Sequence, residues 1–116
     1  NFLNTLIKIH DSKNVLEIGT SNGYSGMWIL GALRETKGRL TTIEFWEKRQ
    51  SVARNNFKTC CPDVTVEPKI GSAIVILEDL LEEAFVSIMR YSNASAYNKE
   101  WDSLLVTCVV TLYNYM

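Results

Sequence analysis

A carboxylate followed closely by a glycine-containing loop is the first feature of this sequence that could do chemistry. Glu17 lies in the mostly apolar run 15–19, and the small polar loop 20–23 comes directly after it. An unpaired carboxylate is costly inside an apolar strand, so Glu17 should meet a hydrogen-bond donor near the strand end, or a basic residue in a structural salt bridge. Gly19 lets the chain leave the strand sharply, and Gly23 permits a ligand to approach the backbone closely. The loop therefore predicts a ligand site.

A second carboxylate, Glu44, closes the next predicted strand. A carboxylate at that place can accept hydrogen bonds from both hydroxyls of a ribose, whereas the alternative is a solvated charge at a strand end. The segment Gly71-Ser72-Ala73 follows the third predicted strand, where small side chains and backbone amides could line a slot for adenine. The glycine loop, the acid at the end of the second strand and the Gly-Ser-Ala segment are each weak evidence alone. Their occurrence in this order along the chain is a more specific indication of a nucleoside site.

The glycine spacing favours one class of nucleoside over another. The loop runs from Gly19 through Gly23 to Gly26, and this spacing departs from the G-x-G-x-x-G pattern that holds a pyrophosphate. Gly26 is expected to allow tight helix packing. A ligand with an adenosine and an amino-acid tail fits better, and four polar residues could bind that tail: Thr20, Ser21, Asn22 and Ser25.

Alternating strands and helices must bring these residues to one edge of a sheet. Helices are predicted over 2–10, 24–34, 47–58 and 73–83, and strands over 15–19, 39–44 and 64–70. Such alternation implies parallel strands joined by right-handed crossovers, so the fold class is α/β with an open parallel sheet. Ligands bind beyond the carboxyl ends of the strands in such a sheet, where both acids lie. Pro68 places the third strand near an edge.

The pattern deteriorates after Glu83. Residues 85–89 could continue the helix or form a strand, 90–100 resemble a loop, and 104–110 could form another buried strand. We therefore expect a single domain over 1–116, with 1–83 recognisable and 84–116 a divergent or truncated tail. Because Asn1 already begins a helical pattern, the chain is interpreted as a fragment. The sheet is expected to be C-terminally incomplete, because the sequence stops at Met116 soon after the possible strand 104–110.

The composition excludes several kinds of protein. The 116 residues carry 12 Lys and Arg against 13 Asp and Glu, a net charge of -1, so there is no basic field for nucleic acid or an anionic membrane. No apolar run approaches the roughly 20 residues that cross a bilayer. The one histidine, His10, offers little for a metal site and is expected near a helix end. The three cysteines (Cys60, Cys61 and Cys108) indicate free thiols in a reducing compartment, hence a cytoplasmic protein.

Three segments together resemble one family. Residues 14–25 resemble the first motif of the class I S-adenosylmethionine-dependent O-methyltransferases, specifically the small-molecule enzymes related to catechol and caffeoyl-CoA O-methyltransferases. Residues 40–44 resemble the family's second strand, and 71–80 resemble its Gly-Asp-Ala turn and the helix that follows. The resemblance covers about residues 2–83 and implies a Rossmann-like methyltransferase domain.

The resemblance also implies a role for individual residues. Gly19, Thr20, Gly23 and the Tyr24-Ser25 pair would line the methionine end of S-adenosylmethionine, and Glu17 would order the loop and approach the methionine amine. Glu44 would hold the ribose, while Phe45 and the Ser72-Ala73 pair would flank the adenine. The reaction would be methyl transfer to the hydroxyl of a small-molecule acceptor.

Departures from the family limit this expectation. Ser72 stands where the family usually has an acid, so one hydrogen bond to adenine is in doubt. The acid that ligates a divalent metal after the fourth strand has no clear counterpart, since Val106-Thr107-Cys108 stands in its place and Asp102 is better read as a turn residue. No metal ligand and no catalytic residue is predicted. The family's later strands are absent, which leaves a sheet edge that a partner or a second subunit of a homo-oligomer could cover.

Three functions remain open at this point. The first is an O-methyltransferase whose cofactor-binding half this chain represents. The second is a non-catalytic nucleoside-binding or interaction module derived from the same fold. The third is a nicotinamide-dependent dehydrogenase, which the glycine spacing disfavours.

Overall fold

A computed structural model of the chain describes residues 1–90 and 104–107, with side chains over 1–83. Helices and strands alternate in the order α1 (Phe2–His10), β1 (Asn14–Ile18), α2 (Tyr24–Thr36), β2 (Arg39–Glu44), α3 (Glu47–Cys60), β3 (Thr65–Ile70), α4 (Ala73–Arg90) and β4 (Leu104–Thr107). The predicted α/β alternation is therefore confirmed. Residues 85–89 continue the helix, because α4 runs on to Arg90.

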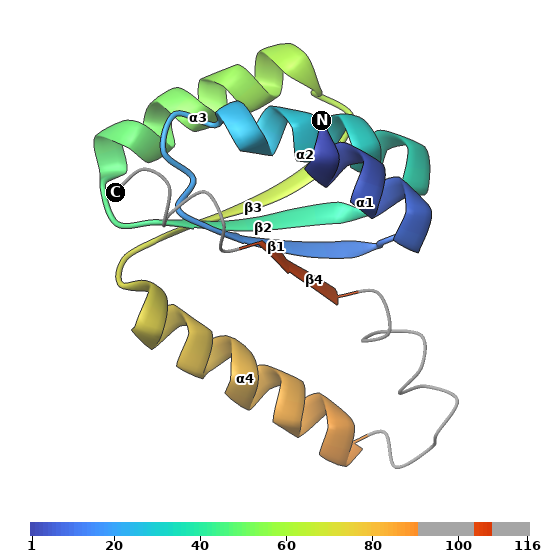
Figure 1. The fold of residues 1–116 in the computed structure, drawn as a ribbon. Coiled ribbons are helices and arrows are strands. Elements are labelled where there is room, and N and C mark those ends of the chain that lie inside the picture. The colour runs from blue at the N-terminus through green and yellow to red at the C-terminus, as the bar shows by residue number, and fades with distance from the viewer. Residues whose placement is uncertain (91–103, 108–116) are drawn as a thin grey trace.

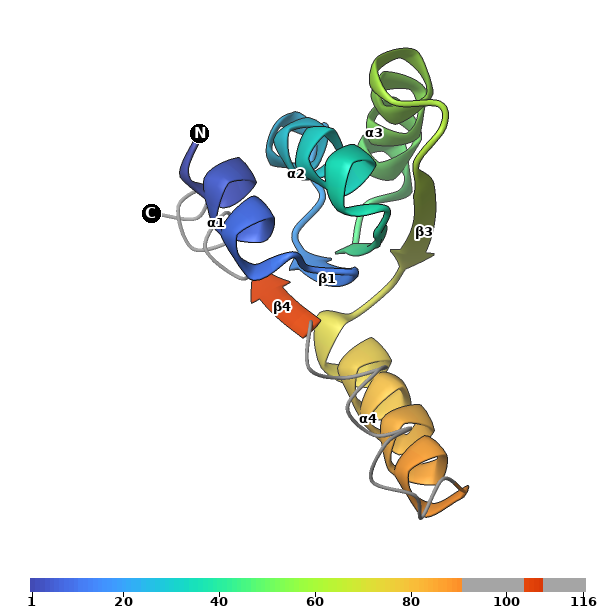
Figure 2. The same cartoon turned by 90° about the vertical axis from the view of Figure 1, so that its right-hand side faces the viewer.

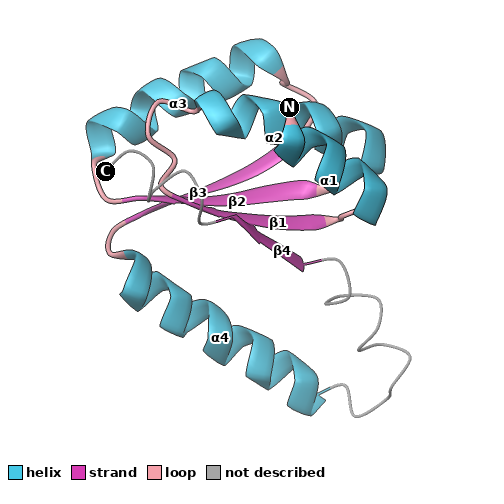
Figure 3. Cartoon of the chain, viewed as in Figure 1, coloured by secondary structure: helices cyan, strands magenta, loops and turns pink. Residues whose placement is uncertain are grey.

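The described strands form one parallel sheet in the order β3-β2-β1-β4 (Figure 1). Helices α1, α2 and α3 cover one face of this sheet, and α4 lies on the opposite side (Figures 1 and 3). The turned view shows α4 running away from the sheet (Figure 2). Strand β3 is an edge of the described sheet, as Pro68 predicts, because its missing N–H is best tolerated there.

Strand β4 extends the sheet beside β1, with Thr107 opposite Glu17. It occupies the first part of the expected strand 104–110, and the remainder of that strand lies outside the described residues, as do Asp102 and Cys108. The predicted loop over 90–100 is wrong at its first residue, because Arg90 ends helix α4, and residues 91–100 lie outside the described residues.

The core lies between the sheet and the three helices α1 to α3. Its buried side chains come from all of these elements: Ile7, Val15, Ile29, Leu30, Ala32, Leu33, Leu40, Ala53, Phe57 and Cys61. Side chains two apart along a strand share a face of the sheet. Glu17 therefore shares the helix-covered face with Val15, and Thr42 shares it with Leu40, which turns two polar groups toward the start of α2.

Helix α1 shows how local sequence fixes an element's ends. The Asn1 side chain accepts a hydrogen bond from the Leu3 amide at 2.9 Å, and Asp11 ends the helix in the left-handed conformation with φ of 51°. Asparagine is a preferred N-cap, and Asn and Asp tolerate positive φ better than most residues. His10 is exposed in the last turn, where a helix end was expected.

Candidate functional site

The loop between β1 and α2 is tied to the end of β2. The amides of Gly19 and Thr20 both donate to the Ile43 carbonyl, at 2.8 and 3.1 Å. Gly19, Ser21 and Gly23 all have positive φ, at 88°, 51° and 89°. Gly19 thus turns the chain sharply out of the strand, as predicted, because glycine adopts this conformation without a steric penalty.

Glu44 faces this loop. Its Oε1 accepts a hydrogen bond from the Ser21 amide at 2.7 Å, and its Oε2 accepts one from the Trp46 amide at 3.0 Å. The residue is only 6% exposed, so the alternative of a solvated strand-end charge is wrong. The second strand therefore delivers a fixed carboxylate to the edge of the glycine loop.

Glu17 is fully buried and has the donors that its position requires. Ser25 Oγ donates to Oε2 at 2.6 Å, and Thr42 Oγ1 donates to Oε1 at 2.7 Å. Burial raises the pKa of Glu17, while the two hydroxyl donors oppose the shift and the charge of Glu44 adds to it. The expected hydrogen-bond donor is confirmed, and it is a pair of hydroxyls rather than a salt bridge.

The hydroxyl network extends from Glu17 to the loop. Thr20 Oγ1 and Thr42 Oγ1 lie 2.6 Å apart and both residues are buried. A hydroxyl has one proton, so when Thr42 donates to an ionised Glu17 it must accept from Thr20. The network therefore connects β1, β2, the loop and the first turn of α2. In it, Thr20 donates to Thr42, and Thr42 and Ser25 donate to Glu17.

Two of the hydroxyls in this network belong to residues that were expected, from the sequence, to bind the ligand. The hydroxyls of Thr20 and Ser25 bond within the protein, and both residues are buried. Asn22 is exposed, and its carbonyl accepts a hydrogen bond from Asn56 Nδ2 at 2.8 Å. Direct contact of Thr20 and Ser25 with a ligand stays a prediction.

Two glycines of this region pack against Phe57 of α3. A Cβ on Gly23 would lie 2.9 Å from Phe57 Cε1 and 3.2 Å from Ala53 Cα, and one on Gly26 would lie 2.6 Å from two ring carbons. The expectation that Gly26 permits close helix packing is confirmed. Gly23 has the same packing role, and its approach to a ligand stays a prediction.

The end of β3 joins the same edge. The Gly71 amide donates to the Glu44 carbonyl at 3.0 Å, so the segment Gly71-Ser72-Ala73 starts beside the second acid. Ser72 is exposed and Ala73 is partly buried as the first residue of α4. Three aromatic side chains from the neighbouring segments are also exposed: Tyr24, Phe45 and Trp46.

Sequence reasoning missed two buried polar residues here. Thr42 completes the Glu17 network, and its position two residues after core Leu40 was the available signal. Gln50 is fully buried, with Nε2 3.4 Å from the Thr42 carbonyl and 3.3 Å from the Lys69 carbonyl. Its spacing with Ala53 and Phe57 places it on the inner face of α3.

The described residues do not fit a divalent metal at the end of β4. Among them there is no cluster of three or more His, Cys, Asp or Glu side chains that could bind a metal ion. Thr107 ends the described part of β4, opposite Glu17. We therefore derive no chemical step through a metal. Within the same residues, no helix is long and apolar enough to cross a membrane.

The fold is Rossmann-like: an open parallel sheet with a glycine loop after its first strand and an acid at the end of its second. The loop and the acid lie at the carboxyl ends of the strands, where such folds bind nucleosides. A family model described as O-methyltransferase matches residues 1–106, and the chain belongs to this family. The family resemblance noted in the sequence is thereby confirmed.

Several known proteins are similar to this chain. Catechol O-methyltransferase of Niastella koreensis is 40% identical over 82 residues, covering 71% of this chain and 37% of that protein. The Bacillus cereus O-methyltransferase, solved in complex with SAH, has a TM-score of 0.63 and 36% identity over 70% of this chain and 36% of its own. TomG of Streptomyces achromogenes, solved with SAM, has a TM-score of 0.63 and 34% identity over 68% of this chain and 35% of its own. The chain thus spans a little over a third of the length of these relatives.

Proposed function

We propose that this chain forms the cofactor-binding half of an S-adenosylmethionine-dependent O-methyltransferase that acts on the hydroxyl of a small molecule. The observation that carries the proposal is the Glu44 carboxylate, held beside the glycine loop by the Ser21 and Trp46 amides. Family membership and the cofactor complexes of similar solved proteins support it.

The hydrogen-bonding capacity of Glu44 fits a ribose. A carboxylate offers about four lone-pair sites, and the two backbone amides use one on each oxygen. Each oxygen keeps capacity for one further donor, which matches the two adjacent hydroxyls of a ribose. The amides also fix the carboxylate before a ligand arrives, so little side-chain entropy is lost on binding.

The remaining contacts follow the edge of the sheet. In the proposal, the loop from Gly19 to Ser25 holds the methionine portion, with Glu17 ordering the loop through Ser25. Exposed Phe45 and the Gly71-Ser72-Ala73 segment flank the adenine.

Alignment is the main contribution we assign to the protein. When bound, S-adenosylmethionine supplies a methyl group on a positively charged sulfur, which is the reactive part of the chemistry. In the proposal, the described residues bind and orient this group. None of them is assigned as a catalytic base.

A non-catalytic nucleoside-binding module is the second candidate. The observation that favours it is the described end of β4, where Thr107 rather than an acid lies beside Glu17. A nucleoside-binding module would bind the cofactor as the enzyme does and would differ from it in turnover, whereas an interaction module would assemble with a partner without methyl transfer. The nicotinamide-dependent alternative would instead require binding of NAD.

Calorimetric titration with S-adenosylmethionine and S-adenosylhomocysteine tests the proposal. We expect binding by the unchanged chain and a loss of about tenfold to a hundredfold in Glu44→Gln and Glu44→Ala, because charge-assisted hydrogen bonds are lost. Glu47→Gln is the matched control, since Glu47 is an exposed acid three residues away. Unchanged affinity in both Glu44 variants, or no binding by chain whose fold is confirmed by circular dichroism, would refute the proposal.

A methyl-transfer assay separates the two candidates. Turnover of a catechol or hydroxycinnamoyl acceptor supports the enzyme, and cofactor binding without turnover by the complete protein supports the module. The cytoplasm is the proposed setting, since free thiols persist there. Strand β4 is the outermost strand on one side of the described sheet, and pairing of this strand with a second copy in a homo-oligomer is part of the proposal.

A further inference from the structure

Two adjacent cysteines end helix α3 with their sulfur atoms side by side. Cys60 is the last residue of the helix and Cys61 its C-cap, and the two Sγ atoms lie 3.2 Å apart. Successive side chains of an extended chain point to opposite sides. Here the change from helical Cys60 to Cys61, with φ of -143° and ψ of 69°, brings both sulfurs to the same side.

The two thiols differ in exposure. Cys60 is exposed, whereas Cys61 is 4% exposed and belongs to the hydrophobic core. A reagent can therefore reach the pair through Cys60, while Cys61 is held in place by its packing.

Hydrogen bonds from within the turn and from helix α2 hold the turn that contains the two cysteines. The Cys61 amide donates to the Phe57 carbonyl at 2.8 Å, and its carbonyl accepts from the Val64 amide at 3.3 Å. Arg34 of α2 donates to the Cys60 carbonyl at 3.4 Å and to both carboxylate oxygens of Asp63, at 2.7 and 3.1 Å. The sulfurs are thus positioned before any ligand arrives, which lowers the entropic cost of binding.

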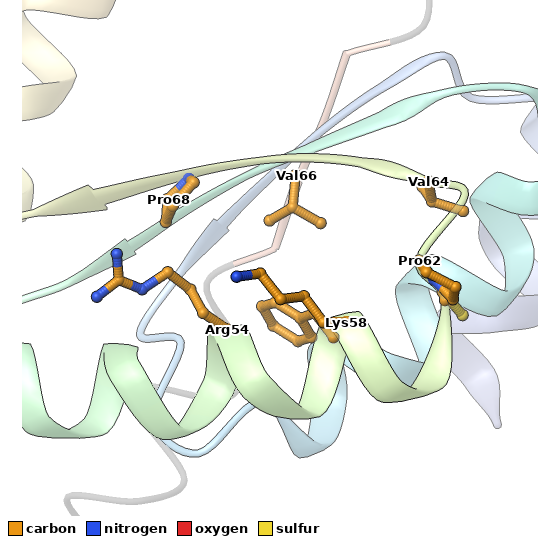
Figure 4. A pocket seen from close by; sticks show the side chains of 8 residues that line it. Arg54, Lys58, Pro62, Val64, Val66 and Pro68 are labelled. Carbon is orange, nitrogen blue, oxygen red and sulfur yellow. The ribbon is translucent and has the colours of Figure 1, made fainter.

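Cys61 is one of the residues that line a groove of about 250 Å³. The groove lies between α3 and the edge strand β3 (Figure 4). Its lining includes the apolar side chains of Phe57, Pro62, Val64 and Val66. The side chains of Arg54 and Lys58 project from α3 toward β3 in the same space (Figure 4). An apolar substituent held at the cysteines would find apolar walls next to it.

We propose that Cys60 and Cys61 form a dithiol site for a monosubstituted trivalent arsenical, R–As(OH)2, with R an apolar group. Each thiol replaces one hydroxyl: an As–S bond forms, an As–O bond breaks, and the thiol proton leaves with the hydroxyl as water. The product R–As(S-Cys)2 and two waters balance the reaction, and no atom changes oxidation state.

The chemistry of the pair selects this class of ligand. Trivalent arsenic makes three bonds, so one carbon and two sulfurs complete its coordination at this site. Inorganic arsenite has no carbon substituent and would keep one oxygen, and the groove would contribute nothing to it. Once one sulfur has bound, the second reacts within the molecule at a high effective concentration, which raises the affinity by about 10² or more.

Titration of the reduced full chain with phenylarsine oxide tests the site. We expect one phenylarsenic group per chain by intact-mass spectrometry, released by the dithiol dimercaptopropanol but retained in a matching concentration of a monothiol. Cys60→Ser should weaken binding about 10²-fold or more. This variant keeps the fold, because Cys60 is exposed, and thermal melting checks that it does.

Cys108→Ser is the matched control and should bind like the unchanged chain. Three results would overturn the proposal: no adduct with the unchanged chain, unchanged binding in Cys60→Ser, or loss of binding in Cys108→Ser. Release by monothiol as readily as by dithiol would also overturn it, because that result indicates attachment through one sulfur.

Discussion

The carboxylate of Glu44, at the end of β2, accepts a hydrogen bond from the backbone amide of Ser21 in the loop after β1, with 2.7 Å between Oε1 and N. Ser21 has a positive φ of 51°, which a non-glycine residue adopts at some cost. The bond to a buried carboxylate stabilises this conformation and aims the amide at the second strand. The acid and the loop therefore shape each other before any ligand binds.

Thr42→Val should destabilise the protein by about 2 kcal/mol or more. The substitution removes the hydroxyl that donates to Glu17 Oε1 and accepts from Thr20, and leaves both buried groups without that partner. Valine has the same shape and a high strand propensity, so the backbone should be kept. Urea denaturation monitored by circular dichroism measures the effect.

Thr41→Val is the control for this substitution. Thr41 is partly buried, and its side chain makes no hydrogen bond to the described residues. Its variant should be neutral or slightly more stable. Equal effects of the two substitutions would contradict a stabilising role for the network.

Glu17→Gln should change how stability depends on pH. Burial raises the pKa of Glu17 above its ordinary value of 4.5, so the folded protein favours the protonated acid. The stabilisation that follows from this raised pKa is fully present below the pKa of Glu17 in the unfolded chain. It is lost as the pH rises through the pKa of Glu17 in the folded protein. The unfolding free energy of the unchanged chain should therefore fall, relative to the neutral variant, as the pH rises from 4.5.

Denaturation curves at several pH values from about 4 to about 8 test this sign. Glu35→Gln serves as the control, because Glu35 is exposed and forms a surface ion pair with Lys8, at 3.2 Å. If the free energy of unfolding depends on pH in the same way for the unchanged chain and for Glu17→Gln, then folding does not change the pKa of Glu17, and the prediction is wrong.

Gly26→Ala should destabilise the protein by about 1–3 kcal/mol, despite the better helix propensity of alanine. The new Cβ would lie 2.6 Å from two ring carbons of Phe57. Gly31→Ala, in the same helix, is the matched control: among the described residues its Cβ would meet only Asn4 Nδ2, at 3.5 Å, and the substitution should stabilise the protein by up to about 1 kcal/mol.

A double-mutant cycle with Phe57→Leu locates the clash. The smaller side chain should relieve part of the cost of Gly26→Ala, which gives a measurable coupling between the two positions. If the cost of Gly26→Ala is the same in both backgrounds, the ring is not its source.

The alternation of strands and helices was predictable because each element up to residue 83 has a clear apolar period and a turn-forming boundary. The end of α4 was not, since the run 85–89 suits a helix or a strand equally and only tertiary structure decides between them. Helix α3 also runs two residues past its predicted end at Lys58, to Cys60, because Pro62 prevents a helix from passing it but does not fix the last turn.

The two acids and the glycine loop were predictable from type and position, but their partners were not. Thr42 and Ser25 bond to Glu17 across 25 and 8 residues of sequence, and such pairings depend on strand register and on the helix direction. The packing of Gly23 against Phe57 was likewise hidden, because an α3 side chain 34 positions later supplies the contact.

The alkylation of the two adjacent cysteines should be strongly biphasic. Burial, followed by the hydrogen bond with Cys60, raises the pKa of the Cys61 thiol to about 11, whereas Cys60 is exposed. Alkylation requires the thiolate, so near pH 8 Cys60 should react with iodoacetamide at least about tenfold faster than Cys61. The Cys61 rate should rise about tenfold per pH unit below its pKa, because the thiolate fraction does so. Peptide mass spectrometry on a Cys108→Ser background resolves the two sites, and equal rates at pH 8 would contradict both the burial and the raised pKa of Cys61.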